Sequence, residues 1–326
     1  MTRSPKIAAA MPQTWSAPFV IAPKTEHTHT IILLHDVGNK GARFGKKFLR
    51  SSELHKLLPT VKFVFPSAKD SHATLTKRGV TMQWFDSAVS VQASADIPPD
   101  SEFQPKFQIE GLRESSAFLR TLVDEEALVL KDTGKRTKNG GYDRVVIGGL
   151  GQGAAAAIFC LLGSDHRLGG FIGLDGWLPF HQDLTIPAGM QGERALMFRL
   201  DALDTVRYIL NLEPLDPSSA VWSADVNDFV LGLKREAADM RNFELALTWA
   251  PCLSPLRTPV FSGRGKVDQR VFVDFPWTLE RTFAMDVTPV ENDDIDDWCR
   301  LTDEYEYLLD FMEWDVLIPC RIPHNV

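Results

Sequence analysis

Residues 148–157 read GGLGQGAAAA and decide the fold. They stand at the end of an expected strand, residues 143–149, and lead into an apolar helical segment, residues 158–162. A strand that passes through a tight glycine turn into a helix is the repeating unit of a parallel sheet covered by helices. The turn has the spacing of a G-x-S-x-G nucleophile elbow with Gly151 at the centre. It also begins like a G-x-G-x-x-G phosphate loop, so these ten residues alone leave both alternatives, and a generic glycine turn, open.

Outward from this turn, short apolar runs alternate with helix-length amphipathic segments. This alternation predicts an α/β fold with a mostly parallel central sheet and helices on both faces. The other expected strands are residues 30–35, 61–66, 171–175, 258–263 and 270–275. The expected helices include residues 109–123 and a closing helix at 302–314, and the expected surface loops are 87–106 and 131–141.

The predicted domain organisation is one domain with an insertion. Residues 1–25 are expected to form an N-terminal tail and residues 26–326 a single domain. Two helix-like segments, 202–212 and 226–240, stand between consecutive strands, where a connection is normally shorter. Residues 181–257 are therefore interpreted as an inserted helical lid over the ends of the strands.

Composition excludes several classes of protein. The 326 residues are 44% apolar and 24% charged, enough to bury a large core, and the net charge of −8 disfavours nucleic acid as a partner. No apolar run of about eighteen residues is present, so no membrane span is expected. The four cysteines have neither C-x-x-C spacing nor disulfide-framework density, which favours reduced thiols and a cytoplasmic location.

Five further stretches resemble one family in the order in which that family has them. Residues 31–39 (IILLHDVGN) resemble the strand and HGxGD oxyanion loop of the acyl-protein thioesterase and phospholipase/carboxylesterase family of α/β hydrolases. The other four are 66–86 with PSA and MQWFD, 168–179 (LGGFIGLDGWLP), 258–268 (TPVFSGRGKVD) and the C-terminal stretch 298–312. The resemblance implies the α/β-hydrolase fold and removes the phosphate-loop alternative.

The same resemblance implies a degenerate catalytic triad. The family's Ser, Asp and His positions fall on Gly151, Asp268 and Asp297 of this chain. Glycine has no oxygen with which to form an acyl-enzyme, and an aspartate does not exchange a proton near neutral pH as an imidazole does. Ordinary serine-hydrolase activity is therefore not expected, and the chain is interpreted as a pseudoenzyme with respect to the family reaction.

The rest of the family site has counterparts in this chain. The oxyanion hole is expected from the backbone N–H groups of Val37 and Gln152, with Asp36 in place of the usual glycine. The remaining candidates for the oxyanion hole or for ligand binding are His35, Trp84 and Trp177.

Three functions remain open at this stage. The favoured hypothesis is a repurposed, non-hydrolytic enzyme, an isomerase, lyase or cyclase that uses Asp268 and Asp297 as acid and base on a hydrophobic carbonyl or acyl compound. The alternatives are a non-catalytic protein that binds such a small molecule and a residual thioesterase or carboxylesterase. No cofactor is expected; a Mg²⁺ or Ca²⁺ site on Asp36, Asp268 and Asp297 is a minor alternative without a recognised motif.

Overall fold

The structure is a computed structural model of the chain, and it describes residues 15–72, 80–87, 105–133, 139–216, 252–265, 275–292 and 305–320. The strands are β1 (Phe19–Ile21), β2 (His29–Leu34), β3 (Val61–Phe65), β4 (Lys69–His72), β5 (Val80–Gln83), β6 (Val145–Leu150), β7 (Gly170–Leu174), β8 (Val260–Gly265) and β9 (Val287–Asn292). The helices are α1 (Gly41–Ser52), α2 (Leu54–Leu57), α4 (Pro105–Lys131), α5 (Gln152–Leu162), α6 (His181–Leu184), α7 (Gly192–Ile209), α10 (Phe275–Phe283) and α11 (Tyr305–Trp314), with 3₁₀ turns η1 (Tyr142–Arg144) and η2 (Ser254–Arg257).

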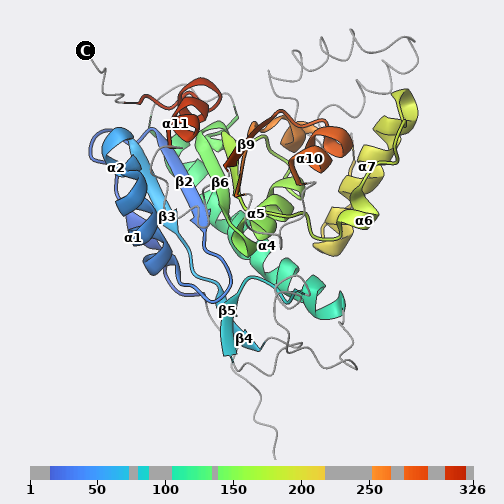
Figure 1. Cartoon of the computed structure of the whole chain (residues 1–326), viewed down its shortest axis with the longest axis horizontal. Coiled ribbons are helices and arrows are strands. Elements are labelled where there is room, and N and C mark those ends of the chain that lie inside the picture. The colour runs from blue at the N-terminus through green and yellow to red at the C-terminus, as the bar shows by residue number, and fades with distance from the viewer. Residues whose placement is uncertain are drawn as a thin grey trace, which may run out of the picture.

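A seven-stranded sheet with the order β1-β3-β2-β6-β7-β8-β9 crosses the molecule (Figure 1). β1 pairs with β3 in the antiparallel sense, and all the other neighbours in this sheet are parallel. β4 and β5 form a separate two-stranded antiparallel sheet below it. Because the parallel strands share one direction, the residues after β2, β6, β7 and β8 meet at the same edge.

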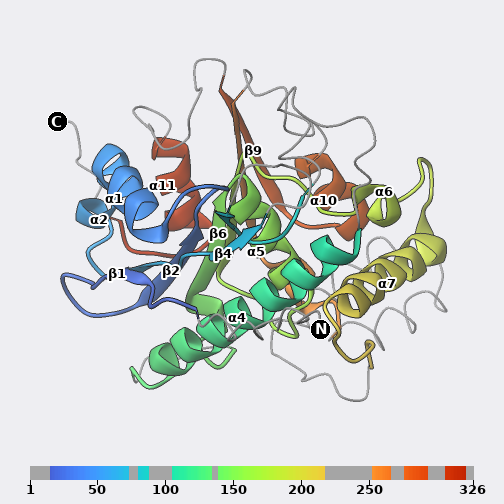
Figure 2. The same cartoon turned by 90° about the horizontal axis from the view of Figure 1, so that it is seen from below.

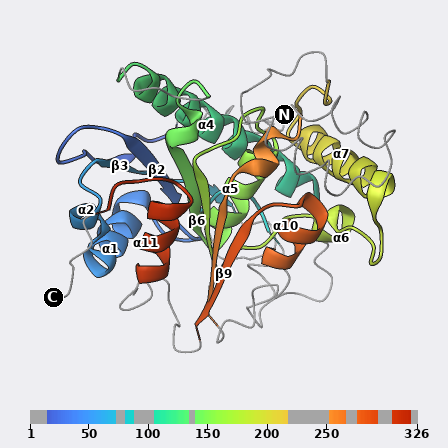
Figure 3. The same ribbon diagram turned by 90° about the horizontal axis from the view of Figure 1, so that it is seen from above.

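Helices cover both faces of the sheet, as Figure 3 shows. Alternate residues of β2 point to opposite faces: Ile31 and Leu33 pack with α1 and α11, whereas Ile32 and Leu34 pack with α4 and α5. Strands that bury both faces are continuous apolar runs, which is the pattern on which the fold prediction depends.

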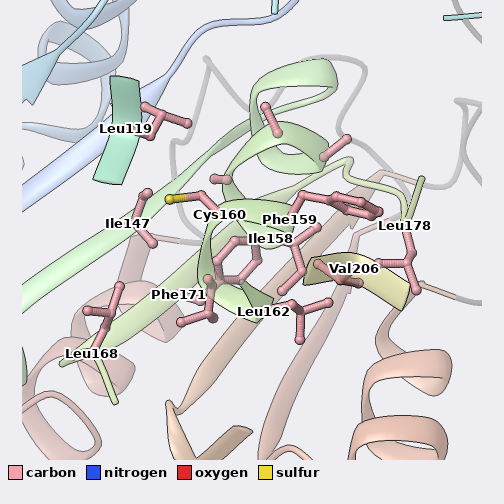
Figure 4. Close-up of a cluster of buried hydrophobic side chains, with 14 of the residues drawn as sticks. Leu119, Ile147, Ile158, Phe159, Cys160, Leu162, Leu168, Phe171, Leu178 and Val206 are labelled. Atoms are coloured by element: carbon pink, nitrogen blue, oxygen red, sulfur yellow. The ribbon is translucent and has the colours of Figure 1, made fainter. Parts of the chain in front are cut away.

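Helix α5 is the centre of the larger core. All eleven of its residues are buried. Figure 4 shows Ile158, Phe159 and Leu162 of this helix among side chains from β6, β7 and α7, including Phe171 and Val206. A helix that is apolar all round is held on every side, so its first turn, which follows Gly151, has a fixed position.

The predicted α/β-hydrolase fold is confirmed, with differences at its edges. β2, β3, β6, β7 and β8 lie within two residues of the predicted strands. β9 was not predicted, and β1 forms within residues 1–25, which were assigned to a tail. The predicted strand 270–275 lies outside the described residues except for Phe275, which begins α10.

Only part of the predicted insertion falls within the described residues. Its helix α7 lies near α4 (Figure 2) and packs into the larger core. The Arg113 guanidinium of α4 donates to the Ile209 carbonyl at the end of α7, at 2.6 Å. Residues 217–251 lie outside the described part, so a lid over the strand ends stays a prediction. Among the helices described, none has the length and apolarity to cross a bilayer.

Candidate functional site

The turn between β6 and α5 has the backbone of a strained elbow. Gly151 has φ 55° and ψ −118°, a conformation that costs an L-residue on the order of 1–3 kcal/mol. Its N–H donates to the Leu174 carbonyl at the end of β7 at 2.8 Å, and its carbonyl accepts the first helical bond from Ala155. The predicted strand–turn–helix is confirmed, with Gly151 at its apex.

Two other glycines bring this turn against the end of β2. A Cβ atom on Gly153 would lie 2.5 Å from the Leu34 carbonyl oxygen and 2.7 Å from the His35 carbonyl oxygen. A Cβ atom on Gly149 would lie 2.6 Å from the same Leu34 oxygen. The G-x-x-x-G spacing therefore serves close approach of two backbones, and it places the loop after β2 directly beside Gly151.

The side chain of Asp36 fills the space above the turn. Its Oδ1 atom accepts the backbone N–H of Gln152 at 2.8 Å. A Cβ atom built on Gly151 would overlap the same carboxylate. Asp36, predicted as an odd residue of the oxyanion loop, therefore stands where a side chain at position 151 would project and is bound to one of the two predicted oxyanion donors.

The side chain of Gln152 holds the loop after β5, a role that the sequence analysis missed. It is 0% exposed; its Oε1 accepts the Trp84 N–H at 2.9 Å and its Nε2 donates to the Phe85 carbonyl at 2.8 Å. The Trp84 indole N–H in turn donates to the His35 carbonyl at 2.8 Å. These bonds join three segments far apart in sequence around one amide. The sequence offers only one signal of this role, a glutamine placed directly after the central glycine of the turn.

His35 is fully buried and has a defined tautomer. The Ala68 N–H donates to its Nε2 at 3.0 Å, so the proton is on Nδ1, which donates to the Asp36 carbonyl at 2.7 Å. Desolvation lowers the pKa of His35 to about 4, only partly offset by the bond to the Asp36 carbonyl. His35 therefore positions the oxyanion loop as a neutral imidazole and does not transfer protons near pH 7.

This burial predicts an acid-sensitive fold. The unfolded histidine takes up a proton near pH 6.5 and the folded one near pH 4, so the contribution to stability is complete above about pH 6.5 and is lost as the pH falls toward 4. The free energy of unfolding is expected to drop by roughly 2–3 kcal/mol from this group between pH 7.5 and 4.5. Urea titrations of the wild type and His35→Gln at both pH values measure it, and equal pH dependence in the two proteins would contradict the assignment.

The other predicted site residues divide into two groups. Val37 is half-buried beside Asp36, and Trp177 is buried after β7, where its ring packs edge-on to Phe85 with centroids 6.3 Å apart. Asp268 and Asp297 lie outside the described residues, so their acid–base role is not tested. Within the described ranges, no cluster of three or more His, Cys, Asp or Glu side chains could hold a metal ion. The proposed Mg²⁺ or Ca²⁺ site includes Asp268 and Asp297, which lie outside those ranges, so it is not tested.

Comparison with known proteins identifies the family. The model of the Phospholipase/Carboxylesterase family matches residues 16–191, more than half of the chain. Acyl-protein thioesterase 1 of Yarrowia lipolytica is 33% identical over 161 residues, which are 49% of this chain and 61% of that protein. Acyl-protein thioesterase 1 of Schizosaccharomyces pombe is 28% identical over 161 residues, with the same 49% and 61% coverage. The chain thus matches about three fifths of the length of these relatives.

The fold is also that of a solved structure. The crystal structure of Zea mays acyl-protein thioesterase 2 superposes with a TM-score of 0.54 at 17% identity, covering 92% of this chain and 98% of that one. At this identity the likeness shows the fold alone.

These relatives correct the function favoured above. A non-hydrolytic isomerase, lyase or cyclase was the first hypothesis, and it was wrong, because the matching relatives are named thioesterases and the family is one of phospholipases and carboxylesterases. The physical reason for the error is that glycine at position 151 argues against one nucleophile but specifies no other reaction. The predicted α/β-hydrolase family is confirmed: the chain belongs to the phospholipase/carboxylesterase family.

Proposed function

We propose that this protein recognises acyl esters or thioesters and hydrolyses them only at a residual rate. The acyl class is supported by the thioesterase relatives and by the elbow geometry at Gly151. The low rate is inferred from one observation: Gly151 stands at the centre of the turn and has no side-chain oxygen that could form an acyl-enzyme.

Residual hydrolysis requires water as the nucleophile. The substrate carbonyl oxygen would accept the Gln152 N–H at the positive end of α5, water would add to the carbonyl carbon, and the C–O or C–S bond would break as the leaving group takes a proton. Loss of a catalytic serine costs roughly 10⁶ in rate, which reduces a typical turnover near 10 s⁻¹ to about 10⁻⁵ s⁻¹.

A non-catalytic acyl-binding protein is the second candidate. It is favoured by the contact between the Asp36 carboxylate and the Gln152 N–H, because that contact uses a donor that turnover needs. Turnover distinguishes the two candidates, whereas ligand binding is common to both.

We expect octanoyl esters and thioesters to raise the Tm of the wild type and to be hydrolysed at about 10⁻⁵ s⁻¹. A fluorophosphonate probe, which needs a nucleophilic serine, should leave no adduct in this protein. Thermal shift, a stopped single-turnover assay and intact mass spectrometry measure these three results.

Gly151→Ala and Gly189→Ala are a matched pair for this test. Both glycines have positive φ, but a Cβ atom at position 151 overlaps Asp36 whereas one at position 189 meets no atom within 4 Å. The octanoyl-induced Tm shift should disappear in Gly151→Ala and persist in Gly189→Ala. An adduct on a serine beside the turn, or no Tm shift with any acyl compound, would refute the proposal.

A further inference from the structure

We infer that Asp36 is an internal ligand of the site: its carboxylate occupies the anion position at the start of α5, and a bound carbonyl or carboxylate group must displace it. The inference deepens the proposed function by assigning a residue that limits access to the Gln152 N–H. It depends on that proposal only for the identity of the displacing ligand.

The first argument is the position of the carboxylate. Asp36 follows β2 and Gln152 follows β6, two neighbouring parallel strands, so the contact spans 116 residues of sequence. The Oδ1 atom lies 2.8 Å from the Gln152 nitrogen, the first backbone N–H of an eleven-residue helix. An anion at this place is favoured by the exposed N–H groups and by the helix dipole.

The second argument is steric and concerns position 151. The carboxylate stands where any side chain at position 151 would begin, and glycine is the residue that leaves that space open. Gly151 and Asp36 are therefore complementary: the absence of one side chain makes room for the other. A ligand carbonyl that approaches the Gln152 N–H meets a negatively charged oxygen already bound there.

The third argument is that the loop carrying Asp36 is held on both sides. The His35 ring bonds the Asp36 carbonyl at 2.7 Å, the Asn39 N–H donates to the same carbonyl at 3.2 Å, and the Gly38 N–H donates to the Met82 carbonyl at 2.8 Å. The main chain at Asp36 is thus fixed, and displacement of the carboxylate requires rotation of its side chain, with no change in the loop.

The test is chemical rescue of Asp36→Ala with acetate. The truncated variant has an empty anion position, so we expect its Tm to fall by several degrees and acetate to restore about 2–4 °C relative to chloride at equal ionic strength. Acetate should not raise the Tm of the wild type or of Asp36→Asn, whose amide oxygen still occupies the position.

Asp175→Gly is the matched control. The Asp175 carboxylate also accepts a backbone N–H, from Gly265 at 3.0 Å, but that N–H belongs to a strand and not to a helix N-terminus. Equal rescue of this variant by acetate, or no rescue of Asp36→Ala, would overturn the inference. If Asp36→Ala does not fold, hydrogen exchange at the Gln152 backbone amide replaces the rescue test. This amide should exchange faster in Asp36→Asn than in the wild type, and equal rates would overturn the inference.

Octanoate separates this inference from the proposed function. If the anion position opens to an acyl site, octanoate should rescue Asp36→Ala at a concentration at least tenfold lower than acetate does. Equal rescue by the two anions would support the internal ligand while contradicting acyl recognition.

Discussion

The triple variant Gly151→Ser, Asp297→His and Asp36→Gly is expected to hydrolyse a short acyl ester on the order of 10²-fold or more faster than the same protein without Asp36→Gly. The serine restores a nucleophile, and the histidine restores a base at the position given by the family resemblance. The third change follows from the structure, because a side chain at position 151 begins where the Asp36 carboxylate now lies and would compete with it for that space. Removing that carboxylate also frees the Gln152 N–H to stabilise an oxyanion.

The measurement is kcat/KM on nitrophenyl butyrate for the triple variant and each pairwise combination. Triad members act as a unit, so Gly151→Ser with Asp36→Gly but without Asp297→His should remain near the residual rate. A fluorophosphonate probe should label the triple variant at the new side chain. A folded triple variant no faster than Gly151→Ser with Asp297→His would contradict the role given to Asp36. One no faster than Gly151→Ser with Asp36→Gly would show that position 297 does not supply the base.

The sheet could be predicted from the sequence because its strands bury both faces. The runs that became β2, β3, β6 and β7 are mostly apolar, interrupted in β3 only by Lys62, and such runs indicate a parallel strand buried on both faces. β9 was missed for the converse reason. It is an edge strand that contains Pro289 and Glu291, and an edge strand with proline and charge lacks that signal.

The candidate site could be predicted in its members but not in its contacts. Asp36, Gly151 and Gln152 were each singled out as family positions, and Asp36 was recognised as an unusual residue for its loop. That its carboxylate bonds the Gln152 N–H depends on the spacing of two strands and on one side-chain torsion. No pattern within either segment contains that information. The buried amide of Gln152, with two partners on the loop after β5, is likewise a tertiary contact only.

Gly153→Ala is expected to destabilise the fold by roughly 3 kcal/mol, although helix propensity alone would make it about 1 kcal/mol more stable. The added methyl group would lie 2.5 Å from the Leu34 oxygen and 2.7 Å from the His35 oxygen, both main-chain atoms of the sheet edge that cannot rotate away. The overlap can be relieved only if α5 moves away from β2, and that movement would separate Asp36 from the Gln152 N–H.

Ala157→Gly, one helical turn further along, is the control: it removes one buried methyl group and should cost only about 1–2 kcal/mol. Urea unfolding of both variants measures the difference, and a Gly153→Ala protein as stable as the wild type would mean that the close approach of β2 and α5 is not what this glycine provides.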